Sequence, residues 1–180
     1  MSFSDNERMS RLTARFAAAA LLATALSALP ASASTAASGY TPEQVCGSGF
    51  GKVAGGTRTV TDVKRVVRGY VHLLYNARTG ENCVVTIKSS FVGQPTLTRA
   101  TLFVKVAGRN DADKFEEEDA YKYYAGPVIA QAKDVCVAFS GLVTNLRANE
   151  NSSASSVQAF GGSTSFGNCG TQRTRKRGIR

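Results

Sequence analysis

The sequence predicts an all-β protein, a small antiparallel β-sandwich or barrel with two disulfides. Short apolar segments rich in β-branched residues alternate with glycine-containing turns about every 10–15 residues, which is typical of such folds. No amphipathic helix of three or more turns stands out, and no internal repeat is present. Four cysteines follow an N-terminal segment with the character of an export signal.

Residues 1–33 have the features of a secretory signal peptide. Three arginines precede an apolar run over residues 16–29, and Ala31-Ser32-Ala33 provides a small-residue cleavage site. The apolar run is shorter than the roughly 20 residues of a membrane-spanning helix, and no later run approaches that length. We therefore expect a secreted protein with no transmembrane segment in the mature chain.

Export would place the cysteines where disulfides form. The four are Cys46, Cys83, Cys136 and Cys169. They allow three pairings, and sequence alone does not choose among them, although pairing of sequence neighbours is favoured. The close Cys-x-x-Cys pairs of a zinc site are absent, so neither a metal nor a cofactor is predicted.

The domain is predicted to span residues 45–170, after a small, polar and flexible lead-in over residues 34–44. Glycines punctuate its first part as turns and bulges would, and they lack the lysine and helix start of a phosphate loop. Residues 57–67 are rich in threonine and valine, which favours a strand or loop over a short helix.

The clearest local signal is a β-hairpin. Residues 70–75 and 83–88 are apolar and β-branched, and residues 76–81 between them contain a glycine turn. Beyond the hairpin, the pattern predicts three kinds of segment. Strands are expected at 96–106, 135–139 and 157–160, a charged loop at 108–119, and a Ser- and Asn-rich exposed loop at 149–156. Residues 121–132 combine an aromatic cluster, a Gly126-Pro127 break and another apolar run.

His72 is the only histidine, so a Ser–His–acid or Cys–His catalytic arrangement would have to include it. It lies in the middle of an apolar strand, and no Gly-x-Ser-x-Gly nucleophile motif occurs. We interpret His72 as structural and predict no catalytic residues.

An acidic run lies within the predicted charged loop, and a solvated loop is its simplest interpretation. Calcium binding and a carboxylate pair for glycoside hydrolysis are the alternatives, although the spacing does not match an EF-hand loop. The run comprises Asp111, Asp113, Glu116, Glu117, Glu118 and Asp119.

Three tyrosines follow the acidic run: Tyr121, Tyr123 and Tyr124. In a single strand the first two would share one face and the third would take the other, so at least one face would be core. Exposed tyrosines could stack on sugars or contact a partner surface.

The positive charge is concentrated at the C-terminus. Residues 34–170 hold 14 Lys and Arg against 11 Asp and Glu, a net of +3. The last ten residues, 171–180, are predicted to be a disordered basic tail of net charge +5 that attracts polyanions, with no specific nucleic-acid partner. Its basic residues are Arg173, Arg175, Lys176, Arg177 and Arg180.

Several phrases together resemble the spore-associated protein A family of small secreted actinomycete proteins. The most specific is Tyr121-Lys122-Tyr123-Tyr124-Ala125-Gly126-Pro127-Val128; the others are Val45-Cys46-Gly47-Ser48-Gly49, Val71-His72-Leu73-Leu74-Tyr75-Asn76, Thr79-Gly80-Glu81-Asn82-Cys83-Val84-Val85-Thr86, Asp134-Val135-Cys136-Val137 and Asn168-Cys169-Gly170. The resemblance covers about residues 45–170. It implies export and association with the spore or cell surface, and it transfers no catalytic residues.

The leading hypothesis is a non-catalytic secreted protein associated with the spore or cell surface, with cell-wall or spore-surface polymers as partners. One alternative is an extracellular binding or inhibitor module for a hydrolase or polysaccharide. Another is a small secreted hydrolase that uses the acidic run.

Overall fold

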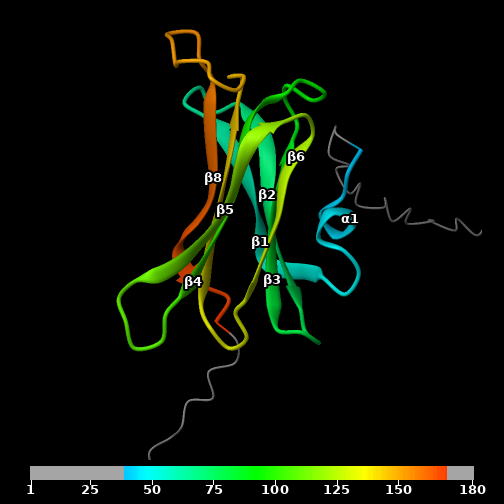
Figure 1. Cartoon of the computed structure of the whole chain (residues 1–180), viewed down its shortest axis with the longest axis vertical. Coiled ribbons are helices and arrows are strands. Elements are labelled where there is room, and N and C mark those ends of the chain that lie inside the picture. Colours follow the sequence, from blue (N-terminus) through cyan, green and yellow to red (C-terminus); the bar gives the residue numbers. More distant parts are fainter. Residues whose placement is uncertain (1–38, 170–180) are drawn as a thin grey trace, which may run out of the picture. The chain divides into compact units, whose positions relative to one another are not determined.

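The computed structural model describes residues 39–169, so the predicted signal peptide and basic tail lie outside the described residues. Eight antiparallel strands form one sheet in the order β5-β4-β7-β8-β1-β2-β3-β6 (Figure 1). The elements are α1 (Pro42–Cys46), β1 (Gly51–Asp62), β2 (Val67–Asn76), β3 (Glu81–Lys88), β4 (Thr96–Lys105), β5 (Ala112–Tyr121), β6 (Tyr124–Gln131), β7 (Val137–Thr144) and β8 (Gln158–Gly167). The all-β prediction is confirmed.

The sheet curls into a near-closed barrel. Its first and last strands, β5 and β6, are consecutive in the chain and contact each other, which brings the two ends of the sheet together. Among the described residues no ladder of backbone hydrogen bonds joins β5 to β6. A seam therefore runs between these two strands.

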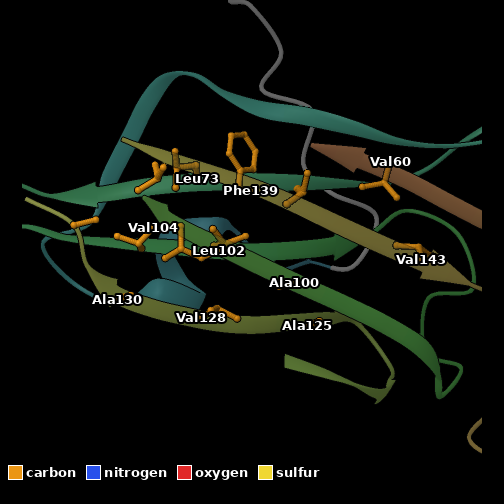
Figure 2. Close-up of a cluster of buried hydrophobic side chains, with 14 of the residues drawn as sticks. Val60, Leu73, Ala100, Leu102, Val104, Ala125, Val128, Ala130, Phe139 and Val143 are labelled. Carbon is orange, nitrogen blue, oxygen red and sulfur yellow. The ribbon is translucent and has the colours of Figure 1, made fainter. Parts of the chain in front are cut away.

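The core fills the inside of the barrel. Leu73 on β2, Leu102 on β4 and Phe139 on β7 are each at most 1% exposed and face one another across the interior (Figure 2). The predicted hairpin is confirmed, because β2 and β3 pair without a register shift from Gly69↔Lys88 to Asn76↔Glu81. Alternate residues of these strands consequently face the inside and outside of the barrel.

A second apolar cluster lies on the outer face of β2 and β3, where α1 packs (Figure 1). Its buried members are Cys46, Leu74, Cys83, Val85 and Ile87. The disulfide Cys46–Cys83 joins the helix to β3, and the disulfide Cys136–Cys169 joins the start of β7 to the end of β8. The pairing of sequence neighbours is therefore confirmed.

The first three residues of α1, 42–44, fall within the segment that the sequence assigns to a flexible lead-in. A capping box explains the difference. The Gln44 backbone N–H donates to the Thr41 hydroxyl at 3.2 Å, and the Thr41 N–H donates to the Gln44 side-chain oxygen at 2.8 Å. Pro42 follows at the first helical position, so order begins before the first cysteine.

The charged loop expected at 108–119 is wrong, because residues 112–121 form β5. This strand pairs with β4 along its whole length, from Lys105↔Ala112 to Thr96↔Tyr121. Arg99 on β4 lies 2.9 Å from Glu118 and 3.7 Å from Glu116, so the neighbouring strand offsets part of the negative charge. Charged side chains on an edge strand also discourage pairing with other chains.

The last two strands are longer than predicted, and the loop expected at 149–156 lies between them as predicted. Glycines let β8 fit between β1 and β7. A Cβ atom at Gly161 would collide with the Thr59 carbonyl, and one at Gly162, where φ is +143°, would collide with the Phe139 carbonyl. Within residues 39–169, no helix combines the length and apolar character needed for a membrane span.

Candidate functional site

The structure separates the three predicted tyrosines. β5 ends at Tyr121 and β6 begins at Tyr124, so the chain turns between them rather than continuing as one strand. Tyr123 and Tyr124 pack with Tyr40, which precedes α1, at ring-centroid distances of 5.5 and 4.9 Å from it. Tyr40 and Tyr123 remain exposed, by 39% and 37%. We call these three residues the tyrosine patch.

Tyr121 is not part of the tyrosine patch and packs against the barrel core instead. Its hydroxyl donates to the Glu117 carboxylate at 2.5 Å. Burial, followed by that carboxylate, raises the pKa of Tyr121 to about 12. Because the tyrosines do not lie in a single strand, Tyr121 and Tyr123 do not share a strand face, and Tyr121 contributes to the packing of the core.

His72 lies on the outer face of β2, and its Nδ1 is 3.0 Å from the Thr57 hydroxyl on β1. Burial, with a smaller contribution from the positive charge of Lys52, lowers the pKa of His72 to about 4. Such a histidine is neutral at neutral pH and is a weak general base there. This geometry is consistent with the structural interpretation.

The acidic residues of β5 divide between its two faces. Glu116 and Glu118 face outward with Arg99, and Lys114 lies 2.9 Å from Glu116. Because strand residues alternate, Glu117 takes the opposite face. In the part of the chain that the structure describes, no group of three or more His, Cys, Asp or Glu side chains is placed to hold a metal ion.

One end of the barrel opens into a cavity of about 310 Å³ that the sequence analysis did not anticipate. We call it the barrel-mouth cavity. It is lined by Val53, Tyr75, Asn82, Ala132, Asp134, Asn168 and Cys169. The alternation of side chains along β3 could have predicted that Asn82 faces the interior, because it lies two residues from the core residue Val84 and therefore on the same face.

A larger groove of about 630 Å³ runs between the β1–β2 turn and the serine-rich loop. Val63 at the turn is 96% exposed and Phe160 on β8 is 54% exposed. Beneath them, Asp62 accepts the backbone N–H groups of Lys64 and Val66, each at 2.9 Å. The groove thus combines a rigid turn with exposed apolar side chains.

The five basic residues of the predicted tail lie outside the described residues.

Comparison with known proteins places the chain in a family. No protein-family model matches it, and no solved structure matches it. The chain is 37% identical over 118 residues to spore-associated protein A of Streptomyces coelicolor, a match that covers 66% of this chain and 69% of that protein. Identity at this level over most of both chains indicates common descent. The chain therefore belongs to the spore-associated protein A family.

Proposed function

We propose that the protein is secreted and acts without catalysis at the surface of the spore or cell. The observation that carries this proposal is its homology to spore-associated protein A. The two disulfides support it, since such bonds persist in oxidising, extracellular environments. The ion pairs of Glu116 and Glu118 with Arg99 favour a non-catalytic role, because pairing holds these carboxylates in a surface network.

The tyrosine patch and the basic tail are the proposed means of attachment. The patch presents amphipathic tyrosine rings at the surface. The Cys46–Cys83 disulfide fixes α1, which follows Tyr40, to the barrel. The tail adds a charge of +5 from its sequence, which attracts anionic wall polymers. These two parts act differently: contact through tyrosines resists salt, whereas attraction through the tail weakens as salt screens it.

Location is tested by fractionating spores, mycelium and medium of the native host and detecting the protein in each. Peptide mapping without reduction would read the N-terminus and the disulfides of the recovered protein. We expect a chain cleaved after Ala33, with both disulfides, in the surface fraction. An uncleaved chain with four titratable thiols in the cytosol would refute the proposal.

Attachment is tested by measuring retention on isolated spore and wall fractions at low and high salt. Deletion of residues 171–180 should reduce retention at low salt and remove most of its salt dependence. Replacement of Tyr40 and Tyr123 by serine should reduce retention at high salt. Replacement of Phe166 by serine, an aromatic residue on β8 with a similar exposure of 41%, is the matched control. Equal retention of all variants would exclude both means of attachment.

A second candidate, a binding or inhibitor module, is supported by the groove beside the β1–β2 turn. Val63 and Phe160 are both exposed and both line this groove, and contiguous exposed apolar surface often marks contact with a partner. Affinity capture from culture medium with wild-type protein and with Val63→Ser distinguishes the candidates. Capture of a secreted hydrolase or polysaccharide by the wild type alone would favour this module over surface attachment.

A further inference from the structure

Asn82 is a buried polar residue with no apparent structural task. It lies on the inner wall of the barrel, where it pairs with Tyr75 on β2 and Ala130 on β6. Only 3% of the residue is exposed. The side-chain hydrogen bonds found within residues 39–169 include Asn76 of the same hairpin but none from the Asn82 amide. Asn82 is not among the fully enclosed unpartnered groups, and its residual exposure is on the wall of the barrel-mouth cavity. Buried amides normally have a partner, because an unpaired one loses its hydrogen bonds to water.

Asn76 shows what a structural asparagine does in the same hairpin. It is similarly buried, at 4% exposed, but its side-chain oxygen accepts the backbone N–H groups of Arg78 at 3.1 Å and Thr79 at 3.3 Å. It thereby fixes the turn between β2 and β3. Asn82 has no such contacts, and it lines the barrel-mouth cavity instead.

The other residues that line the cavity add further hydrogen-bonding and apolar groups to the Asn82 amide. Asp134 supplies a carboxylate that accepts hydrogen bonds, and Asn168 supplies a second amide that both donates and accepts. Tyr75 adds an aromatic ring, while Val53 and Ala132 form apolar parts of the wall. The lining residues include one acid and no base, so the cavity disfavours anions.

We propose that the barrel-mouth cavity binds a neutral sugar ring. A sugar presents vicinal hydroxyl groups, which suit the Asn82 amide and the Asp134 carboxylate, and a C–H face, which suits the ring of Tyr75. A volume of about 310 Å³ lies at the small end of ligand pockets, and this limits the ligand to a single ring or the end of a chain.

This inference does not depend on the proposed surface role, because it concerns the oxidised protein in solution. Finding the protein free in the medium would contradict the proposed surface role but not sugar binding. Finding it on spores without any sugar binding would contradict sugar binding but not the surface role.

The test is a chemical-shift titration of the oxidised full chain with glucose, galactose, mannose and N-acetylglucosamine. Sodium glucuronate is the anionic comparison. The variants are Asn82→Leu, which has a similar volume and no polar atoms, and Gln131→Leu. Gln131 is an exposed amide on β6, and its substitution removes the same chemical group outside the cavity.

We expect at least one neutral sugar to give saturable shifts at Tyr75 and Asn168, with weaker binding of glucuronate. Asn82→Leu should weaken that binding about tenfold or more and should leave the melting temperature unchanged or higher, because no protein hydrogen bond is lost. Gln131→Leu should change neither. Absence of shifts with all four sugars, stronger binding of glucuronate, or unchanged binding in Asn82→Leu would each overturn the proposal. A lower melting temperature in Asn82→Leu with unchanged binding would mark Asn82 as purely structural.

Discussion

The ammonium group of Lys88 donates to the hydroxyl of Thr96 at 2.8 Å, inside the barrel and across the seam between its two edge strands. It also donates to the carbonyls of Gln94 at 2.8 Å and Tyr121 at 2.9 Å. Lys88 is 0% exposed and ends β3. One side chain therefore ties β3 to the start of β4 and the end of β5, where no strand ladder does so.

Replacing Lys88 with methionine should destabilise the protein by about 2–4 kcal/mol, because three buried acceptors lose their donor. Lys105→Met, the same change at an exposed position on β4, should have little effect. Urea unfolding monitored by circular dichroism measures both. Equal stability of the two variants would show that Lys88 does not hold the seam.

Lys88 also predicts a dependence of stability on alkaline pH. Burial lowers the pKa of Lys88 from 10.5 to about 8. Between these values the unfolded chain binds a proton that the folded chain does not, so the free energy of unfolding should rise with pH across this window. Urea unfolding at several pH values should show this rise in the wild type and its loss in Lys88→Met.

His72 predicts a dependence on acidic pH. Its pKa of about 4, against an ordinary value of 6.5, means that the unfolded chain is protonated first as the pH falls. The free energy of unfolding should therefore decrease from pH 6.5 to pH 4. His72→Gln should flatten the curve in this window, and NMR titration of the ring should give the pKa directly. A ring that titrates near 6.5 would contradict the prediction.

Asp62 holds the β1–β2 turn. Besides its two backbone contacts, its carboxylate lies 2.8 Å from a terminal nitrogen of Arg68, and it is 8% exposed. Asp62→Ala should lower the stability, because the backbone N–H groups of the turn and the Arg68 guanidinium lose their shared acceptor. Thermal unfolding compared with Asp113→Ala, at an exposed position, measures this cost. A similar melting temperature for both variants would argue against a structural role for Asp62.

The two disulfides should contribute unequally. They close loops of similar length, with sequence separations of 37 and 33, so the chain-entropy contribution is about 3.5–4 kcal/mol for each. Cys46 and Cys83 also pack in the outer cluster beneath α1, whereas Cys169 is exposed. Alanine pairs replacing each disulfide should show the larger loss of stability for Cys46–Cys83, together with faster hydrogen exchange in α1. Equal losses of stability in the two variants would show that chain entropy accounts for the contribution of both disulfides and that packing beneath α1 adds nothing.

The sequence was sufficient wherever structure depends on near neighbours. The hairpin of β2 and β3 followed from two apolar runs around a glycine turn. Sequence alone left three cysteine pairings open, and the structure has the one that joins sequence neighbours. The capping box at Thr41 is equally local, but the small and polar composition of residues 34–44 as a whole predicts a flexible segment.

The acidic run shows what the sequence could not decide. Its residues repel one another when considered alone, which favours a loop, yet Arg99 from β4 offsets their charge and makes a strand stable.

The sequence by itself thus determined the all-β class, the disulfide-bonded character and the central hairpin, because these depend on periodicity, turn residues and cysteine content. Only the tertiary structure decided which residues meet. It separated Tyr121 from Tyr123, brought Tyr40 to the patch, placed Lys88 across the seam and left Asn82 facing the cavity. Such contacts join residues that are distant in the chain. Their free energy depends on which side chains the fold brings together, and a local sequence pattern does not contain that information.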